Sequence, residues 1–260
     1  YNSVRYITSN QPQNNITTSL ELISINTYGN PPSGRFGHTL VKLNNVKFCL
    51  FGGASGETHN LTYSNDIYIY NVITKIWTKI IININLPMPK ERAAHASACD
   101  NNYNMMIYGG STSNGGLADN QIWILHLDKN DNTKGIWENY TTIGTNPGKS
   151  YGNSLIYMKG YYVLFGGNIN SYLSNDVWII EIKNKNNSNS NNWKKICFEN
   201  DVAPSSRLYH TCCIYIKDDK ENMMIYGGRD SNENPLNDIW GLSFDKNTNW
   251  NWERYPVQNN

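Results

Sequence analysis

The sequence lacks the long apolar runs and the charge imbalance that would indicate a membrane or a nucleic acid as partner. It contains no uninterrupted apolar run of about 18 residues, the length that a membrane-spanning helix needs. Its 22 basic and 21 acidic residues leave a formal net charge of +1, and the two signs are interleaved along the chain. A basic stripe for nucleic acid is therefore not expected, and neither is an attraction to an anionic membrane.

Cysteines are few, and their spacing fits neither a disulfide framework nor a metal site. The five cysteines are Cys49, Cys99, Cys197, Cys212 and Cys213. Their number is odd, and no Cys-x-x-Cys or Cys/His ligand spacing occurs among them. Free thiols behave as small hydrophobic groups, so we expect a reducing compartment, the cytoplasm or the nucleus. The N-terminus lacks a signal-sequence pattern, and because the first residue is Tyr1 we expect the chain to be part of a longer protein.

Motifs for catalysis are also missing. No Ser/His/Asp grouping, phosphate-binding loop or zinc spacing is present, and no non-repeating pair of carboxylates suggests glycoside hydrolysis. We therefore expect no catalytic residue, no metal and no cofactor in this chain. Aromatic residues, in contrast, are abundant at 12%, with 18 Tyr and 8 Trp. Short apolar runs such as 47–51 and 67–70 lie between turn residues, which predicts many short strands.

Four repeated units are the strongest signal in the sequence. A glycine pair ends an apolar run four times, and the first glycines are 57, 57 and 61 residues apart. The pairs are Gly52-Gly53, Gly109-Gly110, Gly166-Gly167 and Gly227-Gly228. An acidic turn and a strand follow each pair, and a tryptophan ends each unit: Trp77, Trp137, Trp193 and Trp252. A Pro-x-x-Arg-x-x-His element precedes three of the pairs, with Arg35/His38, Arg92/His95 and Arg207/His210; the third unit has Ser150/Asn153 instead.

Each repeated feature has a mechanical reason. A glycine pair allows positive φ and close backbone approach at the end of a strand. The Asn-Asp step makes its own turn hydrogen bonds, and the late tryptophan offers a large flat surface for packing. A unit of this size with four strands cannot bury both faces alone, so the units must stack radially on one another.

The ordered set of markers resembles the kelch repeat over residues 31–256. That resemblance implies an all-β fold, a kelch β-propeller with one four-stranded blade per repeat. The four blades are expected at about 31–84, 85–143, 144–200 and 201–256 within a propeller domain spanning 31–260. Residues 1–30 are expected to form an N-terminal partial blade, with 20–25 as the last strand of a preceding blade. Kelch propellers usually have about six blades, so we expect this chain to form part of a six-bladed propeller.

The details of the repeats are similar to one subfamily, the N-terminal kelch domain of Ser/Thr protein phosphatases with kelch-like repeats from plants and protozoan parasites. The matching segments include Gly37-His38-Thr39-Leu40, Gly227-Gly228-Arg229-Asp230 and Pro235-Leu236-Asn237-Asp238. These proteins carry a metallophosphatase domain after the propeller, and its metal-binding motifs do not occur here. The resemblance implies a dinuclear Mn, Fe or Zn centre only for that separate domain, which the present domain would regulate or supply with substrates.

The resemblance also implies where partners bind. In kelch propellers that recruit substrates, binding residues lie on the loops that lead into each blade and on the loops just after the glycine pairs. The corresponding positions here are Arg35, Phe36, Arg92, Tyr151, Asn168, Arg207, Tyr209 and Arg229. Arginine and tyrosine are favoured anchors at protein interfaces, and arginine pairs with carboxylate and phosphate. These residues predict a groove for an acidic or phosphorylated peptide.

A structural interpretation of the same residues stays open. The repeated arginines could instead bond carbonyl groups of an adjacent blade, and the repeated histidines could satisfy backbone groups inside each blade. Arg229 occurs in only one repeat, so it fits the framework less well and the binding role better.

Three classes of protein use domains of this kind. The first is a protein-interaction domain of a Ser/Thr phosphatase; the second is a substrate adaptor for a ubiquitin ligase or a cytoskeletal linker. The third, a copper-radical oxidase, requires paired histidine ligands that do not follow the repeat, and the ligand set is missing. A partial propeller leaves open blade edges, which predicts a homodimer.

Overall fold

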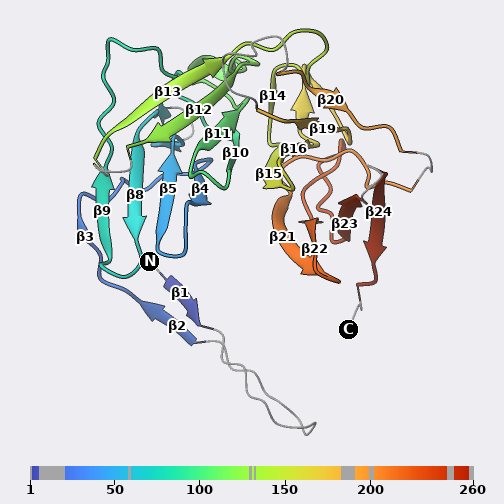
Figure 1. Ribbon diagram of the computed structural model, residues 1–260, viewed down its shortest axis with the longest axis horizontal. Coiled ribbons are helices and arrows are strands. Elements are labelled where there is room, and N and C mark those ends of the chain that lie inside the picture. The colour runs from blue at the N-terminus through green and yellow to red at the C-terminus, as the bar shows by residue number, and fades with distance from the viewer. Residues whose placement is uncertain are drawn as a thin grey trace, which may run out of the picture.

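Short antiparallel strands arranged in radiating sheets make up the chain, as the computed structural model shows (Figure 1). The structure describes residues 2–5, 21–57, 60–128, 131, 133–182, 191–198, 202–244 and 249–257. Among these residues the one helical segment is the short 3-10 turn η1 (Ser113–Gly115). The all-β propeller fold predicted from the repeats is confirmed.

Four sheets form the blades, each built on four antiparallel strands in chain order, and the blades are numbered here along the chain. Blade 1 contains β4 (Thr39–Lys42), β5 (Lys47–Phe51), β8 (Ile67–Asn71) and β9 (Ile76–Lys79). Blade 2 contains β10 (Ala96–Cys99), β11 (Met105–Tyr108), β12 (Ile122–Leu127) and β13 (Gly135–Tyr140). Blade 3 contains β15 (Ser154–Met158), β16 (Tyr161–Phe165), β19 (Val177–Ile180) and β20 (Lys194–Lys195). Blade 4 contains β21 (Thr211–Lys217), β22 (Lys220–Tyr226), β23 (Ile239–Phe244) and β24 (Trp250–Tyr255).

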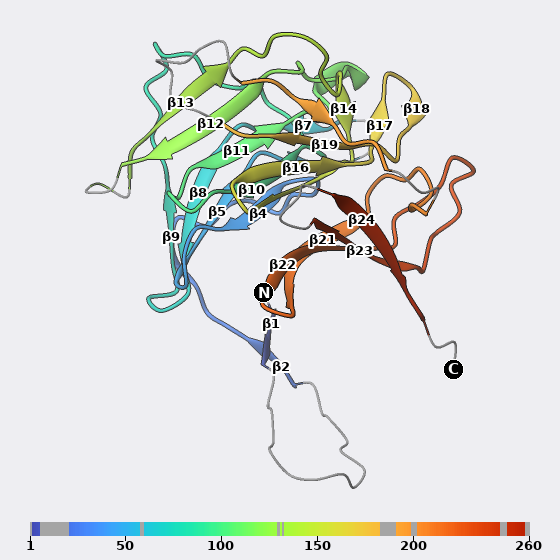
Figure 2. The same ribbon diagram turned by 45° about the vertical axis from the view of Figure 1, so that its right-hand side comes forward.

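Three short N-terminal strands are not among the four strands of any blade. The strand β2 (Glu21–Ser24) falls within the segment expected to complete a preceding blade, but it pairs with β1 (Asn2–Arg5). After it, β3 (Tyr28–Gly29) runs parallel to β9 and adds a fifth strand to blade 1. In Figure 2, β1 and β2 lie below the blades.

The hydrophobic core lies between neighbouring blades, because each sheet has two apolar faces to bury. The first layer, between blades 1 and 2, includes Phe51 and Trp137. The second layer joins blades 2 and 3, and the third, which contains Phe165 and Trp252, joins blades 3 and 4. Propeller blades have this requirement in common: no blade is stable without its neighbours.

Hydrogen bonds between equivalent loops connect the blades near their inner strands. The N–H of Ala94 donates to the carbonyl of Gly37 (2.7 Å), that of Gly152 to Ala94 (2.9 Å), and that of Tyr209 to Gly152 (2.9 Å). All four residues have positive φ, between 55° and 69°. Among the described residues no such bond joins blade 4 to blade 1, so the blades form an arc with two open ends (Figure 1).

Candidate functional site

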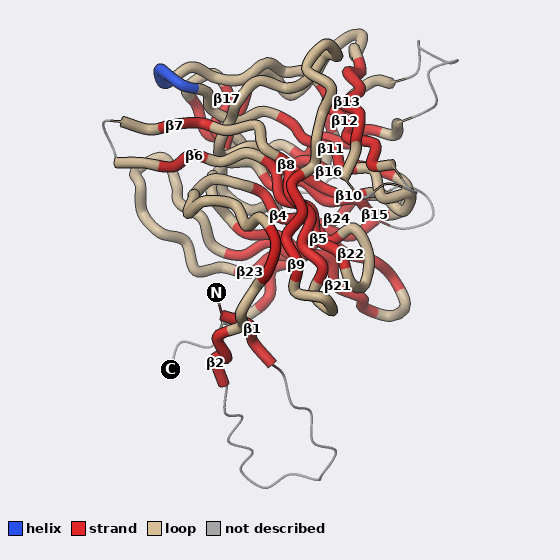
Figure 3. The backbone as a smooth tube through the Cα atoms, turned by 90° about the vertical axis from the view of Figure 1, so that its left-hand side faces the viewer, coloured by secondary structure: helices blue, strands red, loops and turns tan. Residues whose placement is uncertain are grey.

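The loops leading into the blades and the loops after the glycine pairs gather at one end of the blades, called here the loop face. Figure 3 shows η1, β6 (Ala54–Ser55), β7 (Thr62–Tyr63) and β17 (Asn168–Ile169) together at this end. Each leading loop pairs with the post-glycine loop of its own blade. In blade 3, β14 (Ser150–Tyr151) pairs with β17, which pairs in turn with β18 (Tyr172–Leu173). In blade 4, Leu208 bridges to Arg229. Both sets of predicted positions therefore share one surface.

Two of the three repeated arginines are fully buried beneath this surface. The Nη1 atom of Arg92 donates to the carbonyl of Gly109 (3.0 Å), and Nη2 pairs with Asp119 at 3.1 Å. Arg207 repeats the pattern with the Gly227 carbonyl (3.0 Å) and with both oxygens of Asp238 (2.6 and 2.8 Å). Both side chains have no exposed area, so they hold the glycine pair of their own blade and are not presented to a partner.

Arg35 occupies the same position in blade 1. Its Nη1 atom donates to the Gly52 carbonyl (3.0 Å), and Nη2 lies 3.7 Å from Asp66. The side chain is nearly buried. All three repeated arginines therefore have the structural role that the sequence left open, the bonding of backbone carbonyls. Each one bonds a glycine carbonyl of its own blade, however, and not one of an adjacent blade.

The repeated histidines bridge consecutive blades. The Nε2 atom of His95 lies 2.7 Å from the Thr39 hydroxyl, and that of His210 lies 2.7 Å from the Ser154 hydroxyl. Burial lowers the pKa of both imidazoles to about 3, and the neighbouring buried arginine acts in the same direction. Both rings are therefore neutral at physiological pH, as the core of a framework requires.

Arg229 differs from Arg35, Arg92 and Arg207 because its side chain reaches the surface. It is 39% exposed, and its guanidinium lies over the Tyr209 ring, 5.4 Å from the ring centroid. The Tyr209 ring lies 6.0 Å from that of Tyr151. Burial raises the pKa of the Tyr209 hydroxyl, while the Arg229 charge opposes that shift. The result is a partly exposed cation above the Tyr209 ring, with the Tyr151 ring beside it, and such a contact is worth about 0.5–1 kcal/mol at an exposed site.

A cleft of about 530 Å³ between the loops of blades 3 and 4 is lined in part by Arg229 and Tyr151. Of the predicted residues, Tyr151, Asn168 and Arg229 line it, and Tyr209 contacts two of them. Phe36 is also exposed but lies on blade 1 and does not line the cleft. The structure therefore brings four of the eight predicted residues together, places three in the framework and leaves one apart.

The sequence did not indicate the residues that form the other half of the cleft wall. Tyr172 and Leu173 lie on β18, and Glu233 approaches Arg229 with a 3.5 Å separation between oxygen and nitrogen. Tyr172 is largely exposed. These residues belong to single repeats, so no periodic signal marks them, although an exposed tyrosine just after the third glycine pair could have been suspected.

The charge of the cleft is mixed. Arg229 faces Glu233, and Asp230 also lines the wall. Asp230 is engaged in its own turn, where it accepts hydrogen bonds from the backbone N–H groups of Asn232 and Asn234 and from the Asn234 side chain. These bonds lower the pKa of Asp230. A carboxylate or phosphate group of a ligand would replace Glu233 as the partner of Arg229.

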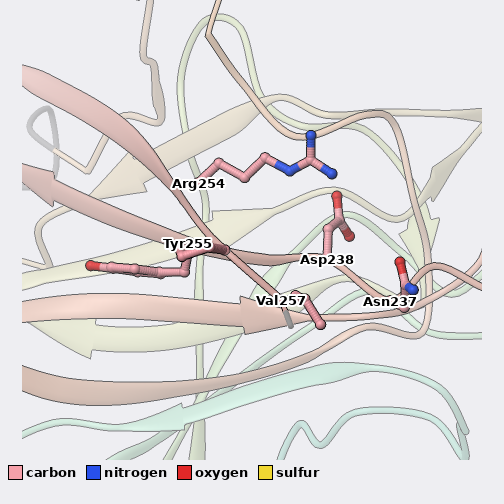
Figure 4. A pocket seen from close by; sticks show the side chains of 6 residues that line it. Asn237, Asp238, Arg254, Tyr255 and Val257 are labelled. Atoms are coloured by element: carbon pink, nitrogen blue, oxygen red, sulfur yellow. The ribbon is translucent and has the colours of Figure 1, made fainter. Parts of the chain in front are cut away.

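A second depression, of about 390 Å³, lies at the edge of blade 4 (Figure 4). Its lining includes Asp238, Arg254 and Tyr255. Asp238 is already paired with Arg207 and accepts from the Trp240 indole, and these bonds lower its pKa to about 2. Because the carboxylate is engaged, this depression offers no free group for acid-base chemistry.

The described residues contain no group of three or more His, Cys, Asp or Glu side chains arranged to hold a metal ion. In the same part of the chain, no helix is both long and apolar enough to span a membrane.

Comparisons with known proteins agree with this geometry. Residues 60–214 match the family model described as the KLHDC2/KLHL20/DRC7 Kelch-repeats domain. An F-box/kelch-repeat protein of Arabidopsis thaliana is 29% identical over 219 residues, which covers 81% of this chain and 44% of that protein. Serine/threonine-protein phosphatase BSL2 of Arabidopsis thaliana is 25% identical over 231 residues, covering 81% of this chain and 21% of that protein. Tip elongation aberrant protein 1 of Schizosaccharomyces pombe is 28% identical over 191 residues, covering 74% and 15%. The chain spans less than half the length of each of these relatives.

Proposed function

Because this chain belongs to the kelch-repeat family, a family of protein-interaction domains, we propose that it binds a peptide segment of a partner protein in the cleft between the loops of blades 3 and 4. The observation that carries the proposal is the exposed Arg229 guanidinium over the Tyr209 ring. Such an arginine-tyrosine pair at the wall of a cleft is the typical composition of an interface hot spot.

The ligand that best fits is an extended segment with an acidic or phosphorylated side chain. Its anionic group would pair with Arg229, displacing Glu233, which is largely exposed and held by one contact of 3.5 Å. Neighbouring residues of the segment would lie against Tyr151 and Tyr172. The buried Arg92 and Arg207 supply no contact to this ligand, although their carboxylate partners keep the loops in place.

The experiment that tests the site is binding to an array of acidic, phosphorylated and neutral peptides, followed by titration of the selected sequences. We expect Arg229→Ala and Tyr209→Ala each to weaken binding about 30-fold or more, the change expected of a hot spot. The control is Tyr103→Ala, because Tyr103 is an exposed tyrosine in the turn between β10 and β11, away from the loop face. Equal binding by wild type and Arg229→Ala would reject the site.

For the whole protein we propose the role of a regulatory or targeting domain of a Ser/Thr phosphatase, which selects substrates or restrains a metallophosphatase domain outside this chain. Similarity to BSL2 over 81% of the chain supports this role. An adaptor of a ubiquitin ligase or a cytoskeletal linker is the second candidate, favoured by the similarity to an F-box/kelch-repeat protein at 29% identity.

Capturing the native protein with an antibody against this domain separates the two candidates. Manganese-dependent phosphatase activity that follows the captured protein and disappears on chelation is expected for the first. Ligase or cytoskeletal components without phosphatase activity would favour the second and would leave the peptide site untouched.

A further inference from the structure

The wall of the cleft between blades 3 and 4 has a net negative charge, although the group proposed to bind there is an anion. Among the described residues that line the cleft, Arg229 is the one cation, and Asp230 and Glu233 are acids. The other lining residues are neutral, so the wall has a net charge of −1. A segment that brings only negative charge therefore meets an attraction from Arg229 and a repulsion from both carboxylates.

The two carboxylates differ in how firmly they are held. Asp230 accepts the hydrogen bonds of its own turn, which lower its pKa. Glu233 has 78% of its side chain exposed, and within the described chain its approach to Arg229 at 3.5 Å is its one side-chain contact. An exposed ion pair of this kind contributes little to stability. When a ligand anion pairs with Arg229, the Glu233 carboxylate is therefore released and has no cation beside it.

The backbone of Glu233 has a left-handed conformation, which favours glycine. Its φ is 65°, and it lies two residues before Pro235, which bridges to the residue after the glycine pair of blade 4. In blade 2 the equivalent bridge is made by Leu117, and the residue two positions before it is Gly115, with a φ of 70°. A glutamate is thus present where the backbone disfavours it, which indicates that its side chain has a role.

We propose that Glu233 selects segments in which a basic residue accompanies the acidic one. The acid pairs with Arg229 and the base pairs with Glu233, so binding exchanges one internal ion pair for two pairs with the ligand. Because Arg229 and Glu233 lie close together, the two ligand charges must be on the same side of the segment. Residues i and i+2 of an extended segment meet this condition.

This inference rests on the proposed peptide site, and it concerns specificity more than affinity. A segment with the acid alone leaves Glu233 unpaired, and a segment with two acids places a second negative charge beside it. Like charges across an interface exclude wrong partners more effectively than the matching pair strengthens the right one. Glu233 would therefore reject segments that are acidic throughout, although Arg229 alone would accept them.

Titration of synthetic peptides tests the selection. The peptides share the best acidic sequence from the array, with Lys, Gln or Glu placed two positions from the acidic residue, on each side in turn. We expect the wild type to bind the Lys peptide about fivefold more tightly than the Gln peptide, the ratio that a partly exposed ion pair provides. This preference should decrease as salt is raised, because exposed charges are screened.

Variants of Glu233 assign the preference to this side chain. Glu233→Gln should bind the Lys and Gln peptides equally well, and Glu233→Lys should prefer the Glu peptide. Glu233→Gly should also lose the preference, with an unchanged or higher melting temperature, because glycine favours the local φ. The matched control is Glu57→Gln, since Glu57 is an exposed glutamate in the turn between β6 and β7 and does not line the cleft. It should retain the wild-type preference.

The outcomes separate this inference from the peptide site itself. Equal binding of the three peptides by the wild type, or a lysine preference that Glu233→Gln and Glu233→Lys leave unchanged, overturns the role of Glu233 and leaves the site in place. Absence of binding by every peptide, or equal binding by the wild type and Arg229→Ala, overturns the peptide site and this inference with it.

Discussion

The role of an arginine near the loop face depends on whether other repeats have an arginine at the same position. Arg92 and Arg207 are buried, and each bonds a glycine carbonyl and an aspartate of its own blade. Arg229 has no counterpart in the other repeats and reaches the cleft. The arginines that recur in the repeats thus stabilise the blades, and Arg229, which does not recur, is the candidate for binding.

Replacing Arg207 by Ala should destabilise the protein strongly. The change leaves Asp238 with a mostly buried, unpaired carboxylate, and removing one partner of a buried ion pair costs about 3–5 kcal/mol. Arg229→Ala is the matched control and should change the free energy of unfolding by no more than about 1 kcal/mol, since it removes only a partly exposed cation–π contact. Urea denaturation measures both values. Equal, small effects would mean that Arg207 is not part of the framework.

The buried histidines should make stability depend on pH. The folded pKa of His95 and His210 is about 3, below the ordinary value of 6.5, so the unfolded chain binds more protons between these two pH values. Their contribution is complete above pH 6.5 and is lost as pH falls towards 3, with a slope of at most about 1.4 kcal/mol per pH unit for each ring.

The double variant His95→Asn, His210→Asn tests this dependence, because blade 3 already uses Asn153 at the same position. We expect a flatter decline of unfolding free energy between pH 6.5 and 4 than in the wild type, measured by urea denaturation at each pH. Parallel curves for the variant and the wild type would show that these rings do not set the dependence.

At the scale of the blade, a residue's contribution depends on whether another blade follows. Phe165 is buried against His210 and Trp252, whereas Tyr226 stands at the same repeat position with half of its area exposed. Phe165→Ala should therefore cost about 3–5 kcal/mol, and Tyr226→Ala should cost far less in the monomer. Thermal or urea unfolding at low concentration provides the comparison. Similar losses at the two positions would show that packing against a following blade does not set the contribution of this ring.

The sequence predicted the strands best where the repeat is strict. The glycine pairs and the acidic turns after them recur, so spacing predicted four all-β units, and the resemblance to kelch repeats implied the propeller and its loop face. The segment 20–25 was expected to complete a blade, but its strand β2 pairs with β1, because nothing in a four-residue strand with two apolar residues specifies its partner. The cleft was half predicted: Tyr151, Asn168 and Arg229 follow from repeat position, whereas Tyr172 and Glu233 depend on loop paths that have no period.

The described part of the chain is an arc of four blades whose loop face is held by buried ion pairs. Strands supply the rigid scaffold, and the loops of blades 3 and 4 supply the cleft. A repeated framework with non-repeated loops allows one fold to present different surfaces.

The central claim, that a partner binds at the cleft between blades 3 and 4, is tested most directly by site-specific photo-crosslinking. A photoreactive phenylalanine analogue replaces Tyr172 in the cleft or Tyr103 in the turn between β10 and β11, two exposed tyrosines. We predict partner adducts from position 172 but not from position 103, and their loss when Arg229→Ala is introduced. Adducts from position 103 alone, or adducts at position 172 that persist without Arg229, would contradict the account.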